Sequence, residues 1–114
     1  MAAAFLNIPD VRGEALDPQH LGWIEILSYS QTRGLAEFTL TKALDSTSPH
    51  LHHLALTGIQ FDGELDAVND GRVVLQFGLK GAVIAALQLG GRGPDGETLE
   101  SLKLNCASVE VERR

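Results

Sequence analysis

Apolar and polar residues alternate with a period of two along most of this chain, and this alternation constrains the fold more than any other feature. In one such run Leu75, Phe77 and Leu79 fall on one face, as expected of a half-buried strand. Only Gly81 separates this run from the next, so the two form either a tight turn or one long bent strand. The predicted strands are 22–31, 35–43, 72–79, 82–89 and 99–112.

The alternation of apolar and polar residues changes phase within the last predicted strand. Leu102 and Leu104 share one parity, whereas Val109 and Val111 have the other. A straight strand would place half of these residues in water. A bulge at residues 107–108 would return them to one face and would also bend the strand, as barrels require. We therefore predict a bulge there.

One helix is predicted between residues 48 and 58. Ser48 is a suitable N-cap, Pro49 fits the first turn, and Gly58 is a typical stop. Leu51 and Leu54 form a short apolar stripe at helical spacing.

Turn signals complete the prediction of the fold. Asn69-Asp70-Gly71 is the clearest hairpin turn, a shorter turn is expected at 32–34, and a glycine-rich flexible loop at 90–96. About seven strands and one helix favour a mainly β fold, as a small β-barrel or sandwich with a short flanking α-helix. The 114 residues (1–114) are expected to form a single domain.

Charge and composition exclude several classes of function. Fifteen acidic and nine basic residues give a net charge of -6, and bases are adjacent only at Arg113 and Arg114, so nucleic-acid binding is not expected. One cysteine excludes an internal disulfide. No apolar run approaches the ~20 residues of a membrane span, and no signal peptide is recognised, so we expect a chain that begins in the cytoplasm without membrane insertion.

Three histidines on the predicted helix are the main metal candidates. His50 and His53 would be neighbours, with His52 between them and His20 far away in sequence. A zinc site would need a third or fourth ligand, and a zincin pair has a different spacing. We therefore expect a solvated helix face that responds to pH and holds no metal, with a metalloenzyme as the weaker alternative.

Other chemical motifs are weak. Glycines within 91–96 match a dinucleotide-loop pattern, but too little chain follows for the rest of that site, and a hairpin loop is the better interpretation. Cys106 has the parity of a buried, inert thiol, and Glu110 with Glu112 would keep a strand face wet. No serine stands in a nucleophile context. The chain is thus predicted to be neither an enzyme nor a cofactor-binding protein.

Two segments in the first half are the most distinctive: residues 11–30, VRGEALDPQHLGWIEILSYS, and residues 38–49, FTLTKALDSTSP. In this order they resemble the haemolysin-coregulated protein (Hcp) family, the inner-tube component of the bacterial type VI secretion system. The terminal 102–112 segment is similar to the last barrel strand of that family. The matching residues, taken as signature or interface candidates, are Gly13, Glu14, Glu25, Phe38, Thr41, Lys42, Asp45, Ser48 and Pro49.

The resemblance implies a barrel that assembles into a homohexameric ring. Such rings stack into a tube, which a contractile sheath propels, and the lumen carries or chaperones effector proteins. Sheath, baseplate and tip proteins are the further partners, and the chain would leave the cell through this machinery. Ser28 and Ser30 are the candidates for the channel wall. Lys42 and Asp45 are expected to form a polar link at the strand-to-helix corner or a contact with a partner.

Two departures from the family affect the expected assembly. A long arm usually follows the Ser-aromatic-Ser strand, but here only residues 31–37 intervene, and the chain ends at Arg114 without the usual tail. Ring formation is therefore expected more than firm stacking. The alternatives are a monomeric β-barrel that binds an apolar ligand or peptide, and a phage-like tail tube subunit.

Overall fold

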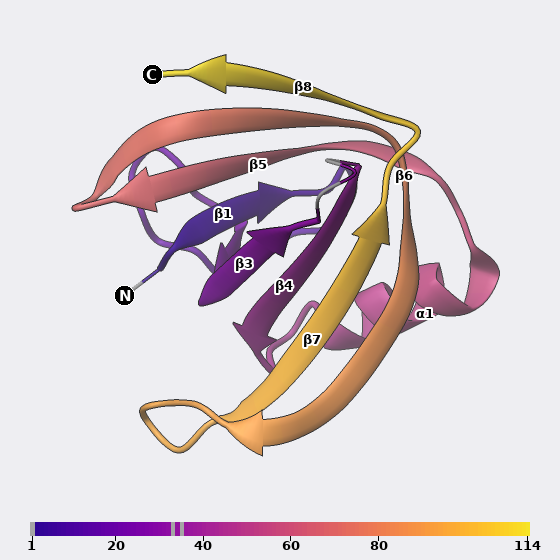
Figure 1. Ribbon diagram of the computed structural model, residues 1–114. Coiled ribbons are helices and arrows are strands. Elements are labelled where there is room, and N and C mark those ends of the chain that lie inside the picture. The colour runs from indigo at the N-terminus through magenta and orange to yellow at the C-terminus, as the bar shows by residue number, and fades with distance from the viewer. Residues whose placement is uncertain (1, 33, 35) are drawn as a thin grey trace.

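A computed structural model describes every residue except 1, 33 and 35 (Figure 1). The described residues form eight strands and one helix, so the mainly β prediction is confirmed, with one strand more than expected. The elements are β1 Ala4–Asn7, β2 Ile24–Ile26, β3 Ser28–Gln31, β4 Glu37–Ala43, α1 Ser48–Thr57, β5 Phe61–Asn69, β6 Arg72–Arg92, β7 Thr98–Asn105 and β8 Ser108–Arg113.

The strands form one antiparallel sheet that curls around the core without closing. Its order is β2-β1-β5-β6-β7-β4-β3, and β8 pairs with β6 outside this path. The two ends, β2 and β3, are consecutive in the chain and are separated only by Leu27, whose backbone N–H donates to the Thr41 carbonyl at 2.7 Å. The predicted barrel is therefore a barrel-like sheet in which the chain itself, rather than a ladder of hydrogen bonds, joins the two ends.

The two runs on either side of Gly81 form one long bent strand, β6, and not a tight turn. Gly81 has a φ of 59°, which only glycine adopts readily. Before this bend β6 pairs with β5 and β8, and beyond Ala82, its last partner to β5, it pairs with β7. The bend thus carries one strand from one side of the molecule to another.

The predicted bulge at 107–108 is wrong, because the chain breaks there into two strands. β7 ends at Asn105 and pairs with β4 and β6, whereas β8 starts at Ser108 and pairs with the first half of β6. The change of phase marks this corner. Of the second parity, Val109 is half-buried and packs against the core, whereas Val111, opposite Phe77, remains 55% exposed.

The helix begins and ends close to the prediction. The N-cap is Thr47 rather than Ser48, and Gly58 ends the helix with a φ of 67°. Leu51 and Leu54 are buried, as the apolar stripe predicts. Figure 1 shows α1 outside the curled sheet, beside β6 and β7.

The hairpin turns agree with their sequence signals where the structure describes them. Asp70 and Gly71 have φ values of 52° and 77°, as a tight turn between β5 and β6 requires. The predicted loop at 90–96 is shorter in the structure, because β6 continues to Arg92; the residues after it form the β6–β7 hairpin turn, in which Gly93 donates its N–H to the Glu97 carbonyl. The predicted turn at 32–34 includes Arg33, which lies outside the described residues.

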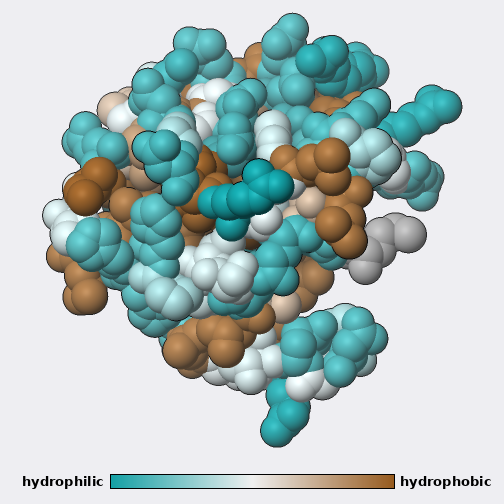
Figure 2. Space-filling model, turned by 180° about the vertical axis from the view of Figure 1, so that it is seen from behind, coloured by the Kyte–Doolittle hydropathy of each residue, from teal (hydrophilic) through white to brown (hydrophobic). Residues whose placement is uncertain are grey.

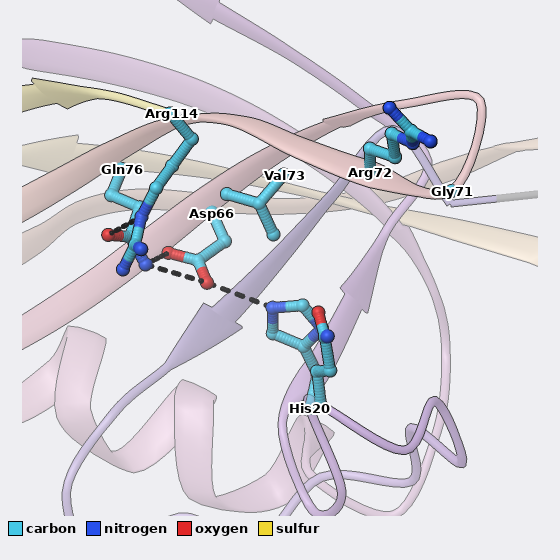
Figure 3. A pocket seen from close by; sticks show the side chains of 8 residues that line it. His20, Asp66, Gly71, Arg72, Val73, Gln76 and Arg114 are labelled. Carbon is cyan, nitrogen blue, oxygen red and sulfur yellow. Dashed lines mark hydrogen bonds and ion pairs between the residues drawn. The ribbon is translucent and has the colours of Figure 1, made fainter.

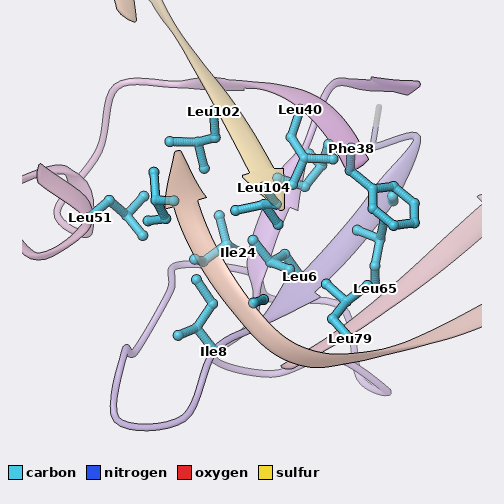
Figure 4. Close-up of a cluster of buried hydrophobic side chains, with 14 of the residues drawn as sticks. Leu6, Ile8, Ile24, Phe38, Leu40, Leu51, Leu65, Leu79, Leu102 and Leu104 are labelled. Carbon is cyan, nitrogen blue, oxygen red and sulfur yellow. The ribbon is translucent and has the colours of Figure 1, made fainter. Parts of the chain in front are cut away.

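Apolar side chains from nearly every strand fill the inside of the sheet (Figure 4). Phe38 packs edge-on against Phe77 with ring centroids 5.2 Å apart. On the face shown in Figure 2, apolar side chains reach the surface in separate places among polar ones. The fully buried large apolar residues are Leu6, Ile8, Ile24, Ile26, Phe38, Leu40, Leu51, Leu65, Leu79, Leu102 and Leu104.

Candidate functional site

A buried ion-pair network, here called the corner network, connects β4, β7 and the start of α1. The Lys42 side chain is completely buried, and its Nζ donates to Glu100 Oε1 at 2.8 Å and to Asp45 Oδ1 at 3.0 Å. Ser48 Oγ donates to the same Glu100 oxygen at 3.0 Å. The predicted Lys42–Asp45 link is therefore present, and Glu100 is the partner that the sequence analysis missed.

The corner network also fixes the first turn of the helix. Asp45 Oδ1 accepts the Thr47 N–H at 2.9 Å, and the Asp45 N–H donates to Ser48 Oγ at 3.1 Å. His52 Nε2 lies 3.3 Å from Glu100 Oε2, a buried oxygen without a hydrogen bond in the described part of the chain. A protonated His52, 42% exposed, can therefore compensate the second oxygen of Glu100.

An open groove of about 260 Å³, here called the acidic groove, lies beside this corner. Its walls carry the carboxylates of Glu14, Glu25 and Asp45, all three predicted signature residues. The structure thus gathers at one place residues that come from separate parts of the sequence. The apolar floor of the groove is formed by Ala15, Leu27, Ala43 and Leu44.

The Gly13–Glu14 turn forms one end of the groove. A Cβ on Gly13 would collide with the Trp23 carbonyl, so only glycine allows this close approach. Glu14 Oε2 accepts the Ser46 N–H at 2.7 Å, and hydrogen bonding from Ser46 lowers the pKa of Glu14. This contact ties the first loop to the segment before the helix.

The outer face of β3, β4 and β7 is rich in small hydroxyl side chains. Ser28 and Ser30 are exposed, and they pair with Thr41 and Thr39 of β4. Thr41 lies opposite Ser101 of β7 in turn. The two predicted channel-wall residues therefore belong to a wider polar face.

A second buried network, here called the His20 clamp, lies on the outer face of β1 and β5 (Figure 3). His20 Nδ1 lies 2.6 Å from Asp17 and Nε2 lies 2.9 Å from Asp66, and the imidazole stacks on Phe5 with ring centroids 4.4 Å apart. Gln76 Nε2 donates to Asp66 at 3.3 Å. An imidazolium can donate to both carboxylates, so this clamp holds the loop between β1 and β2 against the sheet.

An open pocket of about 490 Å³ lies beside the clamp, bordered by Arg72 and Arg114. Arg114 Nε donates to Gln76 Oε1 at 2.7 Å, as Figure 3 shows. Sequence reasoning missed His20 as part of a site, because it lies in a loop, 46 positions before its partner Asp66.

The remaining candidates lie apart from these networks. Phe38 is in the core and Pro49 is exposed at the helix start, as are His50 and His53 along α1. Cys106 is only half-buried rather than buried, and desolvation raises the pKa of its thiol. Across the described residues no three His, Cys, Asp or Glu side chains are arranged to hold a metal ion, and no helix is long and apolar enough to span a membrane.

Comparison with models of protein families identifies the family of this chain. The profile described as "Type VI secretion system effector, Hcp" matches residues 5–112, nearly the whole chain. The chain belongs to the Hcp family. It is accordingly a tube protein of the type VI secretion system. By sequence alone, none of the curated proteins matches this Hcp chain.

Solved structures share the fold of this Hcp chain. "Structure of a type six secretion system protein" has a TM-score of 0.86 at 21% identity, covering 99% of this chain and 84% of that one. Hcp2 from Salmonella typhimurium has a TM-score of 0.84 at 23% identity, covering 96% and 84%. A sheath-tube complex of an extracellular contractile injection system, PVC, in its extended state, has a TM-score of 0.62 at 11% identity, covering 100% and 90%.

Proposed function

We propose that this Hcp chain assembles into a homohexameric ring, that rings form the inner tube of a type VI secretion system, and that the lumen carries effector proteins. The observation that carries this proposal is the hydroxyl-rich outer face of β3, β4 and β7. Lys103 and Glu37, charged residues on this face, pair with each other at 3.3 Å. The sheet therefore offers a wet wall with little net charge, which suits a channel through which proteins pass without adhering.

The proposed partners follow from the same assembly. The subunit contacts its own copies, the contractile sheath, the baseplate and the tip proteins, and it leaves the cell with the tube. The short segment 31–37 leads us to propose weaker stacking between rings than in relatives with a long arm. The filled interior gives no support to a monomeric barrel that binds an apolar ligand.

The first experiment is the mass in solution, by light scattering on a sizing column, followed by electron microscopy of the peak. A ring of six 12.2 kDa chains has a mass of about 73 kDa. Ring-shaped particles of that mass support the proposal. A monomer that persists at all concentrations contradicts it.

A second experiment tests the channel wall. Ser30→Cys in a Cys106→Ser background places one exposed thiol on the hydroxyl-rich face. A gold cluster coupled to this thiol should appear inside the ring in electron micrographs. The matched control is Leu56→Cys, which puts the label on the exposed side of α1, where Leu56 is 87% exposed. A Ser30 label on the outer rim contradicts the assignment of this face to the lumen.

A further inference from the structure

The acidic groove brings three carboxylates together, those of Glu14, Glu25 and Asp45. Within the described residues Glu25 has no ion pair, although its side chain is exposed at the groove. Lys42 is the nearby cation, but it is buried and already shared by Glu100 and Asp45. Leu44 on the groove floor is 48% exposed. The groove thus presents an apolar floor with an acidic rim.

Strand β8 presents the complementary chemistry. Val111 is 55% exposed and shares a face with Arg113, because alternate residues of a strand point the same way. Arg113 forms no ion pair within the described part of the chain. Strand β8 thus presents an exposed apolar side chain beside a guanidinium group, which complements the apolar and acidic lining of the groove.

The sheet places these two surfaces far apart around the molecule. β8 pairs with β6, the middle strand of the path, whereas Glu25 lies on β2 at one end of that path. Asp45 follows β4, which lies near the other end. Two different surfaces on separate sides of a subunit form a heterologous contact, which closes into a ring when the rotation between copies allows it.

We propose that the acidic groove of one subunit receives the Val111–Arg113 face of β8 from the next subunit in the ring. This inference rests on the proposed hexamer and names the residues that join its copies. The Arg113 guanidinium faces the carboxylates of Glu14 and Glu25, and Val111 covers the apolar floor at Leu27 and Leu44. The occupant is a second copy of this chain, because the chain itself supplies the matching charge.

Charge reversal at the two surfaces tests this proposal. In a ring of Arg113→Glu subunits, each groove–β8 contact brings a new carboxylate on β8 against the carboxylates of the groove. In a ring of Glu25→Arg subunits, each contact brings a guanidinium group in the groove against Arg113. Each variant alone should therefore lose rings at concentrations where the wild type remains assembled. We expect at least a roughly tenfold weakening of assembly, since opposed like charges are strongly unfavourable at an interface. Both residues are exposed, so both variants should keep the wild-type circular dichroism and melting temperature.

Mixing the two single variants gives the most specific result. In a ring where they alternate, β8 of the Arg113→Glu subunit meets the groove of the Glu25→Arg subunit, so that the two charges at this contact are exchanged. The other contacts join a wild-type groove to a wild-type β8. Equal amounts should therefore rebuild particles of about 73 kDa that neither variant forms alone. The matched control is Glu112→Arg on the opposite face of β8, which should leave the rings intact.

The outcomes separate this inference from the proposed function. Rings that persist in both single variants contradict the groove–β8 contact and leave the hexamer in place, with another partner for the groove. Failure of the mixture to reassemble also contradicts the contact. A monomeric wild type contradicts the hexamer itself and, with it, this inference.

Discussion

The corner network and the His20 clamp are both buried networks built around carboxylates, but they lie on opposite faces of the sheet. Lys42 and Glu100 have the inward parity of Leu40 and Leu102, so the corner network lies inside, between strands that the core holds in place. The clamp lies outside and joins the sheet to a loop. We therefore expect the same chemistry to stabilise the whole fold at the corner and only a local segment at the clamp.

The largest effect is expected from Lys42→Met. It leaves Glu100 buried without its cation, and breaking a buried pair in this way costs about 3–5 kcal/mol. Urea unfolding should show this loss in the global free energy of unfolding. The double variant Lys42→Met/Glu100→Leu should recover a large part of it, and a double variant no more stable than the single one would contradict the charge explanation.

The next effect is expected from His20→Ala, which leaves Asp66 buried with Gln76 as its remaining partner among the described residues. The loss of a hydrogen bond to a buried charged group costs about 1–3 kcal/mol. Amide hydrogen exchange should become faster in the loop, for example at Gly13 and Ala15, whose N–H groups donate to Gly22 and Trp23. Equal acceleration in β7 would show that the clamp acts on the whole fold, contrary to the comparison.

A smaller effect is expected from His52→Ala at the edge of the corner network. The imidazole is 42% exposed, so its interaction with Glu100 is partly screened and contributes about 0–1 kcal/mol. His50→Ala, on the same helix and exposed, is the matched control. The measurement is the same urea unfolding. If His52→Ala lowered the free energy of unfolding as much as Lys42→Met does, Lys42 would not be the main stabilising partner of Glu100 in the corner network.

The smallest effect concerns Glu14 and its pH dependence. Its pKa is lowered in the folded protein by hydrogen bonds from Ser46, so the ionised form favours folding. This contribution is present above the ordinary value of 4.5 and is lost as the pH falls through the lower folded pKa. The difference in thermal stability between wild type and Glu14→Gln should therefore shrink as the pH falls below 4.5. A difference that grows on acidification would contradict the assignment.

The sequence predicts the local elements well, because their signals lie within a few residues. The helix between Ser48 and Gly58 and the Asn69–Gly71 turn depend on capping and backbone preferences alone. At the corner between β7 and β8 the alternation of apolar and polar residues changes phase in the sequence. A bulge within one strand and the start of a new strand both produce this pattern. Only the pairing of β8 with β6 distinguishes them.

The two networks differ in how far the sequence could reveal them. Lys42 and Glu100 each occupy an inward position of an alternating strand, and opposite charges at two inward positions are a usable signal of a buried pair. His20 gives no such signal. It lies in an irregular loop, and its contact with Asp66 depends on how that loop folds back over the sheet.

The pairing of strands that are distant in the sequence delays the folding of a newly made chain. β4 pairs with β7 although α1, β5 and β6 lie between them in the chain. In the same way, β1 pairs with β5, which follows α1 in the chain. Contacts of such high sequence separation are typical of slow folding, on the order of milliseconds to seconds. While the ribosome is still adding β7, the apolar faces of β1 to β4 have no complete partner. The sheet is therefore complete only after β7 and β8 have been synthesised.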